Sequence, residues 1–264
     1  MGKGIINGRI VDESECTVSV LDRAFQYSYS IYEALKLKNG SFVHLSEHLA
    51  RLYLSGKAIG LGIPYSDEEI SSWLEKLKEV EKLSDATFRI LVFGSEEVKV
   101  FVNHSPLKVY PESYYKEGVD VSTYQAERFM PNVKTSNMLP SYLALASAEK
   151  KGCFEALLVS RDGYVLEGTR SNFYAIKNDK IYTAPDEMVL LGVTRTGLEE
   201  CAGKLSLSVV EKALTMDELF SMDGLFLTST SMRAMPIKSV DGRSVPLSAL
   251  DNIQKLSELI GAWE

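Results

Sequence analysis

The chain is organised around the stretch from Lys134 to Thr196, which opens Lys134-Thr-Ser-Asn137, continues through Tyr164-Val-Leu-Glu-Gly168 and closes Leu191-Gly-Val-Thr-Arg-Thr196. Its first part comes just before a helical pattern. Its second part is an alternating strand pattern that ends at a glycine, and its third is a glycine turn that leads into another helix. This stretch therefore places a lysine, a glutamate and a helix N-terminus in fixed order along the chain.

These three features are the parts that binding of pyridoxal phosphate requires. A lysine amine can condense with the aldehyde of that cofactor, a carboxylate can keep its ring nitrogen protonated, and a helix N-terminus can receive its phosphate. Spacing alone does not establish such a site, because the chain has 29 lysines and arginines. Taken by itself, Lys134 reads as a solvated loop lysine and the Gly192 turn as an ordinary strand-to-helix turn.

The order of several further motifs strengthens the interpretation. These motifs are Asp22-Arg-Ala-Phe25, Tyr32-Glu33, His48-Leu-Ala-Arg-Leu52, Glu155-Ala-Leu-Leu158 and Glu167-Gly-Thr-Arg-Ser-Asn-Phe173. With the lysine and glycine motifs, they resemble the consecutive signatures of class IV aminotransferases, a family that includes branched-chain and D-amino-acid aminotransferases and aminodeoxychorismate lyase. The resemblance covers most of the chain. It implies an α+β enzyme of fold-type IV, with mixed and antiparallel sheets, flanking helices and pyridoxal phosphate between two domains.

The resemblance also implies roles for individual residues. Lys134 is the expected catalytic residue, since its amine would hold the cofactor and move the proton of the substrate α-carbon. Glu167 would pair with the ring nitrogen. The residues expected to bind the cofactor are Arg51, Lys134, Glu167, Val193, Thr194 and Thr230. The residues expected to bind the substrate are Tyr32, Arg89, Ser229 and Ser231.

Local patterns predict hairpins and helices in both halves of the chain. Asn7-Gly8 and Asn39-Gly40 lie between apolar runs and predict tight hairpins. Ser66 and Thr196 each precede a glutamate by three residues, which predicts a helix start at both. We expect no βαβ alternation. The predicted domains are residues 1–112 and 125–264, joined by a connection at 113–124.

Composition narrows the classes of protein. The net charge of −7 and the absence of a clustered basic stripe argue against nucleic-acid binding. The three cysteines are scattered, which suits a reducing compartment, and we see neither a signal peptide nor an apolar run long enough to span a bilayer. We expect a cytoplasmic protein and, from its relatives, a homodimer.

Two alternatives come from other classes of protein. His44-Leu-Ser-Glu-His48 matches a zinc-hydrolase pattern in which two histidines share a metal and Glu47 activates water. The ordinary interpretation is that His44 ends a strand while Glu47 and His48 open a helix, and then no shared metal face exists. The second alternative is a descendant that keeps the fold as a binding module without catalysis.

The substrate is the least constrained prediction. Relatives usually carry Tyr-Gly-Asp-Gly before the aromatic–glutamate pair, whereas this chain has Tyr27-Ser-Tyr-Ser30, and Tyr29 could enter the pocket. Arg89 keeps half of a branched-chain signature, and Ser95-Glu-Glu-Val-Lys99 lacks the Arg-x-His of D-amino-acid enzymes. We therefore expect an aminotransferase that moves an amino group between apolar L-amino acids and a 2-oxo acid such as 2-oxoglutarate. A D-amino-acid aminotransferase and aminodeoxychorismate lyase are the alternatives within the family.

Overall fold

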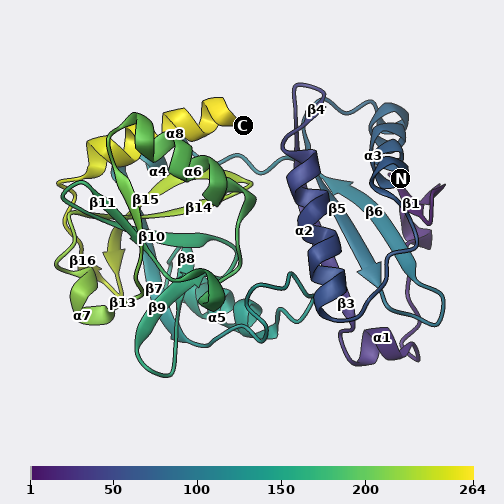
Figure 1. Cartoon of the computed structure of the whole chain (residues 1–264), viewed down its shortest axis with the longest axis horizontal. Coiled ribbons are helices and arrows are strands. Elements are labelled where there is room, and N and C mark those ends of the chain that lie inside the picture. The colour runs from purple at the N-terminus through teal and green to yellow at the C-terminus, as the bar shows by residue number, and fades with distance from the viewer. Residues whose placement is uncertain (1) are drawn as a thin grey trace. The chain divides into compact units, whose positions relative to one another are not determined.

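This computed structural model describes residues 2–264, and the chain divides into two compact units (Figure 1). The first unit runs through Lys108 and also contains Val133–Asn137, while the second contains Val109–Asn132 and Met138–Glu264. Lys134 thus packs with the first unit, although it lies in the part of the sequence expected to form the second domain. The predicted domain limits stay a prediction, and each unit is described by itself.

The first unit is built on an antiparallel sheet in the order β2-β1-β6-β5-β3-β4. Both predicted Asn-Gly hairpins are confirmed, with positive φ angles at Asn7 (49°), Gly8 (80°), Asn39 (50°) and Gly40 (78°). Two successive residues with φ > 0 give the turn whose twist matches that of its strands. The strands are β1 (Lys3–Ile6), β2 (Arg9–Asp12), β3 (Ser30–Lys38), β4 (Ser41–Phe42), β5 (Ala86–Phe93) and β6 (Lys99–Ser105).

Two helices, α2 (Leu45–Ala58) and α3 (Asp67–Glu81), cover one face of this sheet (Figure 1). Their apolar stripes pack on alternate residues of β3 and β5, as the period of two in a half-buried strand requires. The capping box predicted at Ser66 is confirmed. The shorter elements are the 3₁₀ turn η1 (Glu13–Glu15) and helix α1 (Arg23–Gln26).

The second unit contains a larger, mixed sheet whose main path is β12-β11-β10-β14-β15-β7-β8-β9-β13. Strand β9 pairs with both β8 and β10, so the sheet curls back on itself where Glu167 meets Asn172. The strands are β7 (Val119–Gln125), β8 (Glu155–Val159), β9 (Tyr164–Gly168), β10 (Asn172–Lys177), β11 (Lys180–Thr183), β12 (Ser208–Glu211), β13 (Leu214–Thr215), β14 (Gly224–Ser229), β15 (Met232–Val240) and β16 (Arg243–Ser244).

The helices of the second unit correct two expectations. Helix α5 (Leu139–Lys150) joins the parallel pair β7 and β8, and α6 (Val193–Lys204) joins the parallel pair β11 and β12, so two βαβ crossovers are present. Helix α6 begins at Val193, one turn before the start predicted at Thr196. The other elements are α4 (Glu112–Glu117), α7 (Met216–Leu219), α8 (Leu250–Trp263) and the 3₁₀ turn η2 (Asp186–Met188).

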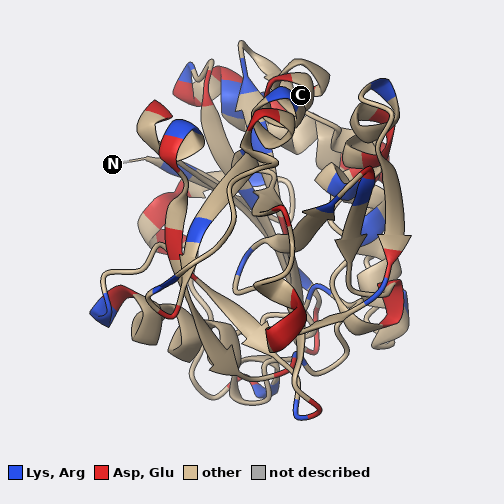
Figure 2. Ribbon diagram, turned by 90° about the vertical axis from the view of Figure 1, so that its left-hand side faces the viewer, with Lys and Arg blue, Asp and Glu red and all other residues tan. Residues whose placement is uncertain are grey.

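The fold is α+β with mixed and antiparallel sheets, as predicted. Acidic and basic residues are interspersed along the ribbon (Figure 2). Within residues 2–264, no helix combines the length and the apolar character that a membrane span needs.

Candidate active site

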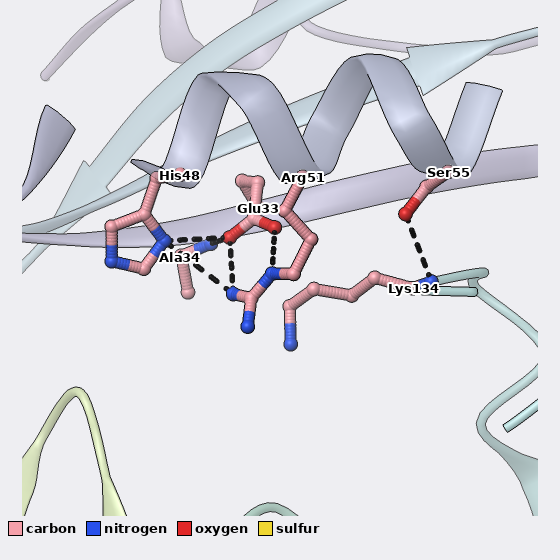
Figure 3. A network of polar contacts seen from close by, with 6 residues as sticks. All are labelled: Glu33, Ala34, His48, Arg51, Ser55 and Lys134. Atoms are coloured by element: carbon pink, nitrogen blue, oxygen red, sulfur yellow. Dashed lines mark hydrogen bonds and ion pairs between the residues drawn. The ribbon is translucent and has the colours of Figure 1, made fainter. Parts of the chain in front are cut away.

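Lys134 is held by its backbone between a strand and a helix of the first unit. Its carbonyl accepts a hydrogen bond from Tyr32 N (3.0 Å), and the next pair along, Ser136 N to Ser30 O, has the same length. The segment thus extends the sheet along β3, opposite β5. From the helix side, Ser55 Oγ of α2 accepts a hydrogen bond from Lys134 N (3.2 Å; Figure 3).

A buried ion pair lies next to this lysine. Arg51 of α2 donates from Nε to Glu33 Oε1 (2.7 Å) and from Nη2 to Oε2 (2.8 Å), a bidentate contact with β3. His48 Nδ1, one helical turn earlier, lies 2.8 Å from the same Oε2. Figure 3 shows the amine of Lys134 and the outer nitrogen of Arg51 pointing to the same side, away from α2.

Charge and burial set the protonation of this network. Burial raises the pKa of Glu33, but the hydrogen bond and charge of Arg51, with smaller contributions from His48 and Lys134, lower it to about 2. Burial lowers the pKa of His48, which outweighs the opposite effect of Glu33. A neutral His48 can meet an ionised carboxylate only by donating from Nδ1, so we assign the proton to that nitrogen.

Tyr32 contacts two cations on the other face of β3. Lys134 Nζ lies 4.6 Å from the centre of its ring, and the Arg89 guanidinium carbon lies 4.4 Å from it. Tyr32 is buried, whereas Arg89 projects from β5 into solvent. The first unit therefore brings together four of the predicted site residues: Tyr32, Arg51, Arg89 and Lys134.

Glu167 is a buried carboxylate of the second unit. Its Oε2 accepts a hydrogen bond from Leu190 N (3.3 Å), and Arg128 Nε lies 3.8 Å from Oε1. Its strand β9 meets β10 at the single pair Glu167–Asn172. A buried, charge-paired carboxylate is the kind of group that can hold a proton on a pyridine nitrogen.

The N-terminus of α6 provides a place for an anion. Gly192 is its N-cap residue, and within residues 2–264 no side chain caps this helix. The first N–H groups, at Val193 and Thr194, are available to an anion there, where the helix dipole favours negative charge. A Cβ at Gly192 would lie 2.2 Å from Asn172 Oδ1, so the loop can approach β10 this closely only as glycine. The chemistry of these donors fits pyridoxal phosphate.

The predicted serines lie in the turn between β14 and β15. Ser229 Oγ and Ser231 Oγ are 3.2 Å apart, with Thr230 between them. Strand β14 pairs with β10, where Thr228 lies opposite Asn172. The second unit thus brings this turn and Glu167 to the two sides of one strand.

The structure shows where the residues of the zinc-hydrolase pattern and of the Tyr27–Ser30 segment lie. His44 precedes α2 in a left-handed conformation while His48 turns to Glu33, and residues 2–264 contain no cluster of three metal-ligating side chains. The ring of Tyr29 packs on Gly94, and its hydroxyl donates to Ile59 O (3.3 Å). Ser28 holds a φ of 52°, in the left-handed region that glycine adopts at the lowest cost.

Four residues that make these contacts were given no role at the cofactor site in the sequence analysis. Glu33 and His48 belonged to quoted motifs, but nothing in the motifs shows that they hold Arg51. Asn172 also belonged to a quoted motif but was assigned no role, and Arg128 was not singled out at all. The local signal for Arg128 is its positive charge shortly before Lys134, and the signal for Asn172 is its place in the motif that contains Glu167.

The chain is similar to known aminotransferases over nearly its full length. Residues 30–240 match the family model described as amino-transferase class IV. The chain is 33% identical to D-alanine aminotransferase from Bacillus licheniformis, over 92% of this chain and 90% of that protein. It is 31% identical to a putative branched-chain-amino-acid aminotransferase from Methanocaldococcus jannaschii, over 95% of this chain and 92% of that protein.

A solved structure supports the fold. The branched-chain aminotransferase of the thermophilic archaeon Thermoproteus uzoniensis, solved with norvaline, has a TM-score of 0.88 at 27% identity, and the match covers 98% of this chain and 95% of that one. The predicted fold-type IV architecture is thereby confirmed. The chain belongs to the class IV aminotransferases, enzymes that depend on pyridoxal phosphate.

Proposed function

We propose that the protein transfers the amino group of apolar L-amino acids, such as leucine and valine, to 2-oxoglutarate. The observation that carries this proposal is the contact of Tyr32 with both Lys134 and Arg89. The guanidinium offers a fork of donors that suits a carboxylate, one aromatic ring away from the reactive amine. Arg89 is thus suited to hold the substrate carboxylate while Lys134 acts at the α-carbon.

The apolar preference is supported by the surroundings of Tyr32. Leu91 of β5 lies directly opposite Tyr32 in the sheet, and Phe101 of β6 lies opposite Leu91. Side chains at paired positions share one face of a sheet. This face therefore offers an apolar surface next to the two cations, which favours a substrate with a hydrocarbon side chain.

The remaining roles concern the cofactor. When bound, pyridoxal phosphate supplies an aldehyde for the amino group and a ring that accepts electrons from the α-carbon. Lys134 Nζ would move the proton that leaves the α-carbon to the cofactor carbon that receives the amino group, and would move a proton back from that carbon to the α-carbon of the new amino acid. Glu167 holds a proton on the ring nitrogen.

The phosphate is assigned to several donors. Arg51 contributes its outer nitrogen, the start of α6 contributes the N–H groups of Val193 and Thr194, and Thr230 contributes its hydroxyl. Ser229 and Ser231 are assigned to the substrate carboxylate, because their hydroxyls lie together in the same turn.

A D-amino-acid substrate is the second candidate, favoured by the 33% identity with D-alanine aminotransferase. Against it stands the segment after Gly94, which carries Glu96 and Glu97 and lacks the Arg-x-His expected of D-amino-acid enzymes.

The test is a set of half-reactions with L- and D-amino acids, followed by cofactor absorption, and with pyruvate release from aminodeoxychorismate as a third arm. We expect L-leucine and L-valine to react fastest. A faster reaction with D-alanine would overturn the substrate proposal, and pyruvate release alone would make the enzyme a lyase. Borohydride reduction followed by peptide mapping checks the lysine, since a label on any residue other than Lys134 would contradict its role.

We further propose a cytoplasmic homodimer. Cys16, Cys153 and Cys201 are unpaired, which supports a reducing compartment.

A further inference from the structure

The backbone of one residue, Leu190, links the two cofactor-binding elements of the second unit. The N–H of Leu190 donates to Glu167 Oε2 (3.3 Å), and its carbonyl accepts from Asn172 Nδ2 (2.7 Å). Leu190 comes two residues before Gly192, the N-cap of α6. The start of this helix is therefore tied to the strands that carry Glu167 and Asn172.

The side-chain amide of Asn172 is used at both of its ends. Its nitrogen holds the Leu190 carbonyl, while its oxygen occupies the space into which a side chain at Gly192 would project. Its backbone lies between Glu167 on β9 and Thr228 on β14. No backbone strain requires glycine at position 192, where φ is −68°, so the close approach of Asn172 is what excludes a side chain.

The turn that carries Glu167 is fixed from behind by another buried carboxylate. Glu155 of β8 accepts hydrogen bonds from Thr169 Oγ1 (2.5 Å), Thr169 N (3.3 Å) and Ser171 Oγ (3.3 Å). These bonds do not involve the loop before α6. Loss of the Asn172 side chain would therefore remove one of the two hydrogen bonds that hold Leu190, and it would leave the Glu167 turn in place.

We propose that Asn172 is a positioning residue that sets the start of α6 at the correct distance from Glu167. The inference rests on the proposed function, which assigns Glu167 to the ring nitrogen and α6 to the phosphate. The ring nitrogen and the phosphate are parts of one molecule at a nearly fixed separation. If the protein holds Glu167 and the start of α6 at the matching separation, binding of one part favours binding of the other, which we call linked binding.

The experiment measures linked binding without the lysine bond. The probes are 4-deoxypyridoxine, its 5′-phosphate and inorganic phosphate, none of which has an aldehyde, and each is titrated calorimetrically into the apoprotein. Asn172→Ala is expected to weaken binding of the phosphorylated ring about tenfold, the equivalent of one lost hydrogen bond. Binding of the ring alone or of phosphate alone should change by less than about twofold, because each element stays intact.

Two comparisons make the test specific. Thr183→Val removes another buried side chain-to-backbone bond, from Thr183 Oγ1 to Phe173 O (3.0 Å), and should leave the affinities for all three probes unchanged. Gly192→Ala should weaken binding of the phosphorylated ring when it is made in the parent protein. The same change should have little further effect in the Asn172→Ala background, because the clashing amide is then absent.

The outcomes separate the inference from the function on which it rests. A parent protein that does not bind the phosphorylated ring contradicts the proposed function. If Asn172→Ala binds the phosphorylated ring as tightly as the parent does, Asn172 has no positioning role. An equal loss of affinity for all three probes also overturns the role, because that result indicates a structural defect. If Asn172→Ala does not fold, Asn172→Ser is measured in the same way, and its hydroxyl should restore part of the linked binding.

Discussion

Glu33 sets the conditions under which Arg51 can act. The guanidinium of Arg51 is the main partner of a fully buried carboxylate, so its orientation is fixed before any phosphate arrives. Removing Arg51 would strand that charge and cost stability as well as cofactor affinity. The effect of Arg51→Ala on cofactor binding alone therefore cannot be measured cleanly, and the carboxylate is the better residue to change.

The pH dependence of stability tests the ion pair of Glu33. Its pKa is about 2 in the folded protein against 4.5 for the free side chain, so its contribution is complete above about pH 5 and is lost as the pH falls toward 2. The difference corresponds to about 3 kcal/mol. The parent should lose about that much more free energy of unfolding between pH 5 and pH 2 than Glu33→Gln does, measured by urea denaturation.

A control separates this carboxylate from the general effect of acid. Asp162→Asn changes an exposed carboxylate in the turn before β9 and should keep the pH dependence of the parent. Equal pH dependence in the parent and in Glu33→Gln would show that the ion pair does not hold Glu33 ionised.

At the scale of elements, local sequence signals were sufficient to predict a hairpin or a helix start when all the residues that determine it lie in one short segment. The Asn7-Gly8 and Asn39-Gly40 hairpins and the Ser66 capping box are of this kind. The predicted start of α6 was wrong. Thr196 and Glu199 have the spacing of a capping box, but the helix begins at Val193, next to Asn172. The βαβ crossovers were missed because strand partners are chosen by tertiary packing.

In the candidate site too, some residues could be predicted from the sequence and others could not. Lys134, Glu167 and the Gly192 turn were recognisable because their order along the chain carries the information. The partners that orient them were not, since Glu33, Arg128 and Asn172 reach their contacts across the sheet or from other elements. No periodic pattern in the sequence encodes such side-chain contacts.

The turn into β3 offers a prediction about backbone strain. Ser28 is exposed and has a φ of 52°, a conformation that costs a residue with a Cβ roughly 1–2 kcal/mol. Ser28→Gly removes that cost but adds about 0.4–1 kcal/mol of unfolded-state entropy. We expect a net gain of up to about 1 kcal/mol in the free energy of unfolding, measured by urea denaturation.

The matched control is Ser41→Gly, at an exposed serine of β4 that lacks a positive φ. This variant should be less stable than the parent, because it gains unfolded-state entropy without relieving strain. If both variants were destabilised equally, Ser28 would carry no strain.

At the scale of the whole molecule, each unit has a hydrophobic core of its own, yet apolar side chains also remain on the surface. Three of them lie on one face of α5, at the i, i+3 and i+4 spacing that places residues side by side. Leu139 is 63% exposed, Tyr142 70% and Leu143 46%. A contiguous exposed apolar stripe is characteristic of a surface that another protein covers.

We expect a second copy of the chain to cover this stripe in a homodimer. Light scattering should then give twice the 29.4 kDa mass of one chain. Tyr142→Glu places a charge in the centre of the stripe, where burying it would be costly, and should shift the mass toward that of a single chain. Val80→Glu is the control, because Val80 is an exposed residue of α3 in the first unit and its replacement should leave the dimer intact. A parent protein with the mass of one chain would contradict the homodimer, and a Tyr142→Glu protein that stayed dimeric would place the interface away from α5.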